Sequence, residues 1–434
     1  MSNVNVPAGP ERQHRSMKGF RSMTASPAGH PAHPKLTDAL RGQPKTVWVT
    51  AFAAVIAFMG IGLVDPILNT ITEELGATPS QTTLLFGSYL GVQVVAMLLT
   101  GVMSYRFGAK RTLITGLVLI VLAAGACALV NSIESLVWLR ALWGLGNAFF
   151  IATALSVIVG AAAGGQQGAI LLYEAALGVG LAVGPLLGAV LGSVSWRGPF
   201  AGTAALMAVG VILCATMLSK DGHRSERQRI RLVDPLLALR NRNLLLTSIG
   251  SAFYTAAFFS IIAWSPFVLD EGAFYIGFVF FGWGLCTAIS GVVLAPKMAS
   301  RFGERGGAVI AVLVYAVILL AMTAGNKTVV VIGIIVSGIF SGILNTLFTG
   351  SAMSSGSGPR AVNSAGYNFL RWMGGAVSAV LVGHVAEWLG LRAPFWIAAI
   401  CCAVAAGLLL LRTKQGHDAD PHSVPEEAAA IGAE

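Results

Sequence analysis

The sequence predicts an all-α membrane protein with twelve transmembrane helices, arranged as two six-helix repeats in parallel orientation. Of its 434 residues, 55% are hydrophobic and only 11% are charged, whereas soluble proteins carry about 25% charged residues. Apolar stretches of about twenty residues, enough for one bilayer crossing each, recur along the chain. Weak internal similarity divides these stretches into two equal sets, as in a duplicated membrane domain.

The predicted organisation begins with a basic N-terminal tail over 1–45, which contains six prolines and seven Lys or Arg and is expected to be disordered. The first six-helix bundle covers 46–218, and a polar cytoplasmic linker over 219–242 connects it to a second bundle over 243–411. A disordered C-terminal tail over 412–434 follows. The predicted membrane helices cover 47–70, 82–104, 112–130, 133–158, 168–191, 199–218, 243–268, 274–296, 306–324, 328–352, 362–386 and 393–411.

Positive charge predicts the orientation in the membrane. With the N-terminus in the cytoplasm, 23 Lys and Arg lie on the cytoplasmic side and 3 on the other side, which is the bias expected of cytoplasmic loops. Both termini are therefore expected in the cytoplasm, and the net charge of +9 marks this face rather than a nucleic-acid surface. The five cysteines lie in apolar stretches without a CxxC pair, so we expect packing roles rather than disulfides or metal ligands.

Two short motifs locate the internal repeat. Arg106–Gly108 reappears as Arg301–Gly303, and Arg197–Phe200 reappears as Arg392–Phe395 with the same Arg-x-Pro-Phe pattern, both at an offset of 195 residues. The third, sixth, ninth and twelfth predicted helices contain no charged residue and no His. Because charge inside a bilayer is costly, we expect these four helices at the periphery and the others around a cavity.

The stretch over 171–192, LLYEAALGVGLAVGPLLGAVLG, carries a glycine at every fourth position in its second half. On a helix these glycines form one stripe, along which another backbone can approach closely. Pro185 lies within the stripe and predicts a kink. The stripe serves either tight helix packing alone or the movement of this helix. It consists of Gly180, Gly184, Gly188 and Gly192.

Two sequence motifs resemble those of the major facilitator superfamily. Gly180–Gly188, GLAVGPLLG, resembles the Gly-x-x-x-Gly-Pro-x-x-Gly signature of its antiporters, and this resemblance implies export. The run GVMSYRFGAKR is similar to the loop motif after the second helix, although Tyr105 replaces the usual acid. Its basic residues either act in the conformational change, as the resemblance implies, or only set the topology. The matching residues are Gly101, Arg106, Gly108, Lys110 and Arg111.

Three charged side chains within predicted spans of the first half are candidates for proton coupling. They are Glu174, Asp65 and Arg140. Because a charged side chain inside a bilayer is costly, its presence suggests a functional role. Glu174 is the leading proton carrier. Asp65 is either a second carrier or an interfacial cap, and Pro66 after it favours a kink or an end of the helix there. Arg140 lies in LRALWGLG, which resembles the superfamily's Arg-x-x-x-Gly-x-Gly motif tied to proton coupling; otherwise it extends to the outer surface.

Other polar and aromatic residues are candidates for a substrate cavity, and each also fits a packing role. Tyr89 and Gln93 share one face of the helix predicted over 82–104. Arg371 lies near the middle of the helix predicted over 362–386, within a cluster at helical spacing. The cavity candidates are Tyr89, Gln93, Asn345, Tyr367, Asn368, Arg371 and Trp372.

The chain contains no Walker A, HExxH or GxSxG motif, so we expect neither an ATP-driven pump nor an enzyme. The resemblance covers about residues 47–411 and is strongest to the twelve-helix drug:proton antiporters of the superfamily. It implies a cell-membrane protein, surrounded by lipid, that exports small amphipathic molecules in exchange for protons. It also implies that no cofactor, metal, nucleic acid or obligate protein partner is needed. The alternatives are a proton symporter or metabolite transporter of the same fold, and a non-transporting membrane sensor or lipid-handling scaffold.

Overall fold

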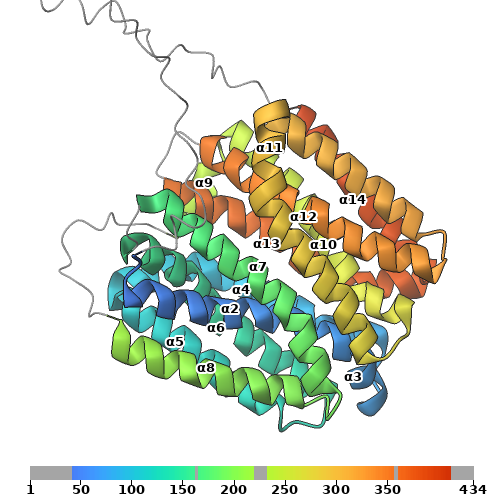
Figure 1. Ribbon diagram of the computed structural model, residues 1–434, viewed down its shortest axis with the longest axis horizontal. Helices are drawn as coiled ribbons and strands as arrows, with labels where there is room; N and C mark the ends of the chain where they lie inside the picture. Colours follow the sequence, from blue (N-terminus) through green and yellow to red (C-terminus); the bar gives the residue numbers. More distant parts are fainter. Residues whose placement is uncertain (1–41, 162–164, 219–231, 356–359, 412–434) are drawn as a thin grey trace, which may run out of the picture.

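The computed structural model describes residues 42–161, 165–218, 232–355 and 360–411, and in these ranges every regular element is a helix (Figure 1). Eleven of the described helices are long and apolar enough to cross a membrane. In the first half they are α2 (Lys45–Gly62), α4 (Pro79–Phe107), α5 (Ala109–Cys127), α6 (Ile133–Ala161), α7 (Gly165–Gly192) and α8 (Gly198–Met217). In the second half they are α10 (Arg242–Leu269), α11 (Ala273–Met322), α12 (Lys327–Ser355), α13 (Arg360–Leu389) and α14 (Ala393–Leu410).

The first membrane helix ends before the predicted boundary at residue 70. The span expected over 47–70 is divided into α2, the 3₁₀ turn η1 (Asp65–Ile67) and the short helix α3 (Leu68–Glu74). Pro66 explains the division, because proline has no N–H group and disfavours the helical conformation in the residue before it. The break thus falls where the chain leaves the apolar stretch and turns back toward α4.

The long helix α11 contains two membrane-length segments that meet at Gly303. This glycine has φ 70° and ψ 162°, outside the helical region, so the segments on either side of it are separate helices. The sequence predicts a longer loop here, but a one-residue turn is sufficient. Gly108, between α4 and α5, has a similar conformation with φ 92° and ψ 155°. Because positive φ favours glycine, the repeated Arg-Phe-Gly motif makes the same turn in both halves.

A hydrogen bond next to each of these turns is repeated as well. Lys110 Nζ donates to the carbonyl oxygen of Ala215 at 2.9 Å, near the end of α8. Arg305 Nη2 donates to the carbonyl oxygen of Leu410 at 2.5 Å, at the end of α14. Donors and acceptors are each 195 residues apart, and cations stabilise helix C-termini, where carbonyl groups lack helical partners. The repeat seen in the sequence therefore extends to tertiary contacts.

The two halves are separate bundles that meet along two pairs of helices, α4 with α13 and α7 with α11. The main contacts of α5 and α8 stay within the first half, and those of α14 stay within the second. Three of the four uncharged helices thus lie outside the contact surface between the halves, as expected. A short helix in the predicted linker, α9 (Asp234–Ala238), packs against α13.

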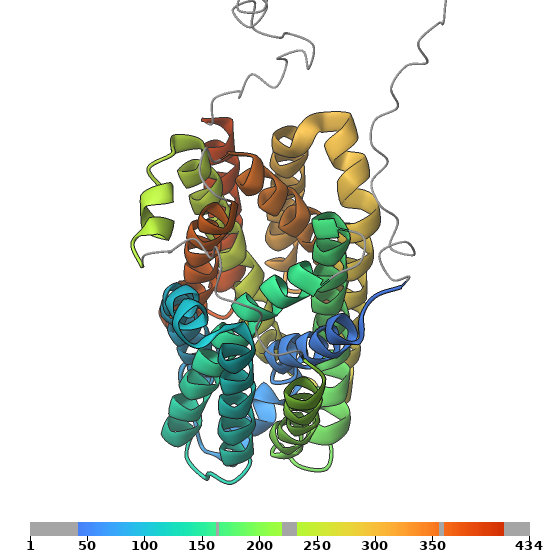
Figure 2. The same cartoon turned by 90° about the vertical axis from the view of Figure 1, so that its left-hand side faces the viewer.

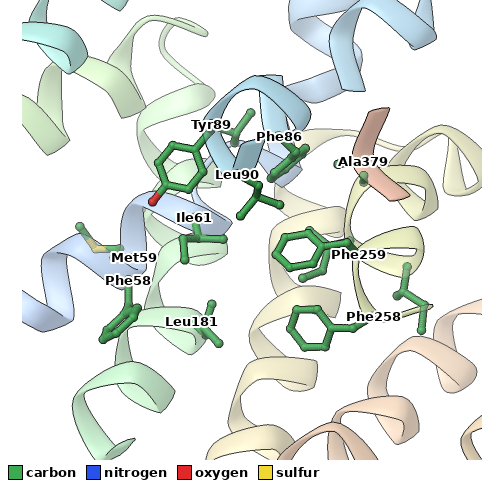
Figure 3. Packing of buried hydrophobic residues seen from close by; sticks show 14 of the residues in the cluster. Phe58, Met59, Ile61, Phe86, Tyr89, Leu90, Leu181, Phe258, Phe259 and Ala379 are labelled. Atoms are coloured by element: carbon green, nitrogen blue, oxygen red, sulfur yellow. The ribbon is translucent and has the colours of Figure 1, made fainter. Parts of the chain in front are cut away.

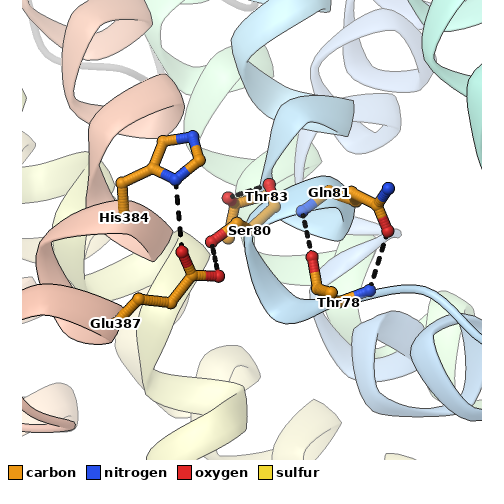
Figure 4. A network of polar contacts seen from close by, with 6 residues as sticks. All are labelled: Thr78, Ser80, Gln81, Thr83, His384 and Glu387. Atoms are coloured by element: carbon orange, nitrogen blue, oxygen red, sulfur yellow. Dashed lines mark hydrogen bonds and ion pairs between the residues drawn. The ribbon is translucent and has the colours of Figure 1, made fainter.

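Two hydrogen bonds between the halves lie at one end of the molecule, which we call the far end. The opposite end, where α2 begins and α8 ends, is called the tail end; Figure 2 looks onto it and shows the first half below and the second half above. At the far end, Ser80 Oγ on α4 donates to Glu387 Oε1 on α13 (Figure 4). Asn69 Nδ2 on α3 also donates to the Pro266 carbonyl oxygen on α10 at 3.1 Å. The halves are therefore joined at the far end by polar contacts as well as by packing.

Candidate functional site

The glycine stripe of α7 lies against α2. A Cβ atom added at Gly184 would lie 2.7 Å from the carbonyl oxygen of Met59, and one at Gly188 would overlap the carbonyl oxygen of Leu63. Gly180 meets the backbone of α2 in the same way. Only residues without a side chain allow two helix backbones to approach this closely. The stripe therefore occupies the α2 side of the helix, which leaves other faces of α7 for the space between the halves.

A cavity lies between the halves near the middle of the bundle. Figure 3 shows Phe258 and Phe259 of α10 facing Ile61 of α2 and Leu181 of α7 across this region. Its volume of about 20 Å³ is enough for about one water molecule, so a larger molecule enters only when the halves move apart. The lining residues are Phe58, Ile61, Leu177, Leu181, Thr255, Phe258, Phe259, Asn345, Arg371 and Trp372.

Arg371 is the charged residue among the described side chains that line the cavity. Its Nη2 donates to Asn345 Oδ1 at 2.9 Å, and the hydroxyl of Tyr254 donates to the same oxygen at 3.1 Å. The guanidinium carbon lies 5.5 Å from the ring centre of Trp372, within the range of a cation–π interaction. Helices α10, α12 and α13 thus contribute to one polar group on the wall formed by the second half.

Only part of the cluster predicted around Arg371 lines the cavity. Trp372 lines it together with Arg371. Tyr367, in contrast, is fully buried, and its hydroxyl shares a hydrogen bond of 3.1 Å with Ser251 on α10. Asn368 Nδ2 donates to Ser364 Oγ one turn earlier on the same helix. Tyr367 therefore lies in the packing between α10 and α13, and Asn368 is half-buried and bonded within its own helix; neither is among the lining residues.

The candidates on α4 lie inside the first half. Tyr89 and Gln93 are both fully buried, and Asn147 on α6 lies between them. Asn147 Nδ2 donates to Gln93 Oε1 at 3.1 Å and to the hydroxyl of Tyr89. The three side chains form a buried polar cluster between α4 and α6, beside the cavity rather than on its lining. The sequence alone gives the shared face of Tyr89 and Gln93 but not their partner.

Arg140 is completely buried and does not extend to the surface. Its Nε donates to the Leu85 carbonyl oxygen and its Nη1 to that of Gly60, each at 3.3 Å. The guanidinium carbon lies 4.5 Å from the ring centre of Tyr89 and 4.7 Å from that of Trp143. A buried cation is stabilised by such acceptors and aromatic faces. Arg140 thus connects α2, α4 and α6 at the core of the first half.

The two acidic candidates have only their backbone placed. Asp65 begins η1 and Glu174 lies on α7, but both side chains are outside the described part of the structure. Leu177 and Leu181, three and seven residues after Glu174, line the cavity. Residues at this spacing share one face of a helix, so the face of α7 that contains these positions is turned toward the cavity.

The loop motif after α4 lies at the tail end. Gly108 makes the turn with positive φ, and Lys110 holds the end of α8 through the carbonyl oxygens of Ala215 and Leu218. Arg106 and Arg111 are exposed, as residues that set the membrane orientation would be. Gly101 lies within α4.

Several lining residues were not among the sequence candidates. They are the aromatic residues Phe58, Phe258 and Phe259 and the polar residue Thr255. Tyr254, whose hydroxyl lies 3.1 Å from Asn345 Oδ1, was not among the sequence candidates either. In the sequence, Tyr254 and Thr255 stand out only as a Tyr-Thr pair in a helix that carries several other Ser and Thr residues, and such residues are frequent in membrane helices that pack closely.

Comparison with known proteins agrees with this architecture. The chain is 43% identical over 377 residues to the multidrug efflux protein YfmO of Bacillus subtilis (strain 168), a match that covers 86% of this chain and 95% of that protein. It is 24% identical over 298 residues to the quinolone resistance protein NorA of Staphylococcus aureus (strain MRSA252), which covers 66% of this chain and 76% of NorA.

The fold is also similar to that of a solved structure, a mutant of the nucleoside transporter NupG, with a TM-score of 0.68. The match covers 84% of this chain and 100% of the NupG chain at 14% identity, so it concerns the fold alone. The family model of the Major Facilitator Superfamily matches residues 50–376 and 270–432. With these matches and eleven described helices able to cross a membrane, this multi-pass membrane protein belongs to the Major Facilitator Superfamily.

Proposed function

We propose that the protein exports drugs or other small amphipathic molecules across the cell membrane by alternating access, in exchange for protons. The observation that carries this proposal is the 43% identity to a multidrug efflux protein over nearly the whole chain. The cavity between the halves supports it, because its lining combines aromatic and aliphatic side chains with a few polar groups. Such a surface suits molecules that are mostly apolar with one polar end.

The proposal includes twelve membrane crossings with both termini in the cytoplasm. The turn at Gly303 supports the count, because it divides α11 into two segments, each near the length that a bilayer requires. The excess of Lys and Arg in the tails and alternate loops supports the orientation. The far end is then the outer side, and the described conformation has its halves joined at that side.

Glu174 is the proposed proton carrier, with Asp65 as the second candidate. Burial favours the protonated form of a carboxyl group, and access to water or a nearby cation favours the ionised form. When the cavity opens to opposite sides in turn, the same acid takes up a proton from outside and releases it inside. No cofactor is required, since the proton gradient supplies the energy. Arg140 holds α2, α4 and α6 together and is proposed to transmit the change between them.

Transport in everted membrane vesicles tests this function. An imposed proton gradient, acidic inside, should drive accumulation of an exported dye in vesicles that contain the protein. In symport the dye would instead leave the vesicles together with protons, so the direction of dye movement distinguishes symport from antiport. If the gradient drives no movement of any compound from a broad panel of drugs and dyes, the proposal is wrong.

Glu174→Gln tests the coupling. The amide preserves size and hydrogen bonding but cannot release a proton, so the variant should insert and bind substrate normally, with substrate affinity less dependent on pH. It should lose accumulation driven by the proton gradient while retaining exchange down a substrate gradient. The matched control is Glu304→Gln, which makes the same change at an acid of the tail end. Gradient-driven transport by Glu174→Gln at the wild-type rate would leave Asp65 as the carrier.

A further inference from the structure

One polar group on the cavity wall has no partner of its own. Thr255 lines the cavity and is buried, yet its Oγ1 forms no hydrogen bond within the described residues. Thr247, two turns earlier on α10, shows the usual arrangement, in which Oγ1 donates to the Asn243 carbonyl oxygen at 2.8 Å. A buried hydroxyl without a partner is costly, and in proteins such a group often faces a ligand or water.

The methyl group of Thr255 packs against α13. Its methyl carbon Cγ2 lies on the α13 side, 3.3 Å from the position of a Cβ atom at Gly375. The hydroxyl and the methyl group are separate branches from Cβ, so packing of the methyl group against α13 leaves the hydroxyl for another direction. Since Thr255 lines the cavity, its unbonded hydroxyl is the polar group that this residue can present there.

Asn345 presents a donor to the same space. Its Oδ1 accepts from Arg371 Nη2 and lies within hydrogen-bond distance of the Tyr254 hydroxyl, whose proton is shared with the Ser341 carbonyl oxygen, and a carbonyl oxygen has two lone pairs. The acceptor side of the amide is therefore used, and the amide that remains for a ligand is Nδ2, which donates. Arg371 also carries only donors. Asn345 Nδ2 and Arg371 thus offer hydrogen-bond donors, and the Thr255 hydroxyl can donate or accept, all set among aromatic and aliphatic walls.

We infer that the cavity binds aromatic, uncharged compounds that carry a carbonyl acceptor, such as a ketone, ester or amide, with the carbonyl oxygen directed to Thr255 and Asn345. This inference rests on the proposed function, because it names the substrate class of the same cavity. The aromatic ring would lie against Phe58, Phe258 and Phe259, where it replaces water by apolar contact. A carbonyl oxygen accepts from both the Thr255 hydroxyl and Asn345 Nδ2, whereas an ammonium group can only donate to the Thr255 oxygen and is opposed by the Asn345 donor and the Arg371 cation.

Binding of three compounds with one scaffold tests the inference. Naphthyl methyl ketone, ethylnaphthalene and naphthylmethylammonium differ only in the polar group and can each be titrated calorimetrically into the full-length protein in lipid nanodiscs. The ketone should bind about five- to thirtyfold more tightly than either of the other two, which is the range of one to two net hydrogen bonds of about 1 kcal/mol each. Equal or tighter binding of ethylnaphthalene or naphthylmethylammonium would overturn the inference.

Two substitutions assign the preference to these residues. Thr255→Val keeps the shape and removes the hydroxyl, so the ketone should lose about three- to tenfold in affinity while ethylnaphthalene is unaffected. Thr247→Val, the same change on the same helix at a hydroxyl that is already bonded, should leave both affinities unchanged. Asn345→Asp replaces the Nδ2 donor with an oxygen and should shift the preference from the ketone to naphthylmethylammonium.

The results separate this inference from the proposed function. If Thr255→Val and Thr247→Val affect the ketone equally, the hydroxyl of Thr255 is not a ligand contact and the inference is wrong. Gradient-driven transport of any other compound in the everted vesicles would still support efflux. If no compound is transported, the proposed function fails even where the ketone binds.

Discussion

Asn345 Oδ1 is the point at which three helices of the second half are joined beside the cavity. It accepts hydrogen bonds from Tyr254 on α10 and from Arg371 on α13, while Asn345 itself belongs to α12. Asn147, on α6 of the first half, instead donates to Gln93 and Tyr89. The same residue type thus positions a cation on the cavity wall in the second half and joins an uncharged cluster beside the cavity in the first half.

Arg371→Ala should impair transport without reducing the amount of protein in the membrane. A hydrogen bond to a charged group contributes about 1.5–3 kcal/mol, and 1.4 kcal/mol corresponds to about tenfold, so we expect a loss of roughly tenfold or more in the efflux rate. Efflux from cells and protein level by immunoblot measure the two quantities. Arg392→Ala, which removes an exposed arginine bonded to the Thr323 carbonyl oxygen, is the matched control. Wild-type efflux of every transported compound by Arg371→Ala would reject a role in the cavity.

Helix α7 combines two contacts on different faces. Its glycine stripe lies against α2 of the same half, and Pro185 and Ala189 contact Gly277 on α11 of the other half. The helix continues through Pro185. A helix that packs backbone to backbone on one side and spans the seam between the halves on another links movements of the two. This geometry explains the glycine stripe by close packing against α2. A role of the stripe in helix movement stays a prediction.

Gly188→Ala should destabilise the protein. The added methyl group would overlap the Leu63 carbonyl oxygen on α2, and overpacking of this kind costs about 1–3 kcal/mol. Thermal unfolding of the protein in detergent should show a lower midpoint. Gly407→Ala is the control, since it lies in α14 with open space around the added carbon and alanine favours helix formation there. An unchanged midpoint for Gly188→Ala would mean that α2 and α7 are not packed as described.

At the scale of the whole molecule, the far end determines which side is closed. Ser80 on α4 donates to Glu387 on α13, and Glu387 Oε2 lies 3.3 Å from His384 Nδ1 (Figure 4). On the other seam, between α7 and α11, the close contacts involve Gly277 and Gly284 with the backbone of α7. Closure therefore combines a hydrogen bond to a carboxylate on one seam with glycine packing on the other.

Ser80→Ala should shift the population toward conformations that are open at the far end, because it removes the hydroxyl that joins the halves. Spin labels at Glu73 and Phe274, in a background without the five native cysteines, would report the separation of the halves by electron–electron distance measurement. We expect a larger fraction of long distances for Ser80→Ala. Ser88→Ala removes a hydroxyl of the same helix that bonds to Val137 within the first half and should leave the distribution as in the unsubstituted protein. Identical distributions for the two variants would contradict the role of Ser80.

The sequence by itself determined the apolar spans, the break at Asp65–Pro66 and the repeat of the Arg-Phe-Gly motif, whereas the one-residue turns at Gly108 and Gly303 came from the structure. These features depend on local composition, proline and glycine, and the repeat that relates them is visible in the linear order of residues. The membrane orientation and the proton carrier stay predictions, because they depend on a lipid bilayer and on proton exchange.

Only the tertiary structure decided which side chains line the cavity. Lipid is as apolar as the interior of a membrane protein, so an apolar face does not reveal whether it contacts lipid, a neighbouring helix or a cavity. For this reason Thr255 and Phe258 were not predictable, and Tyr367 could not be separated from Arg371, four residues away on the same helix. Arg371 bonds to Asn345 and Tyr367 bonds to Ser251. Both partners are brought close only by the packing of α10, α12 and α13.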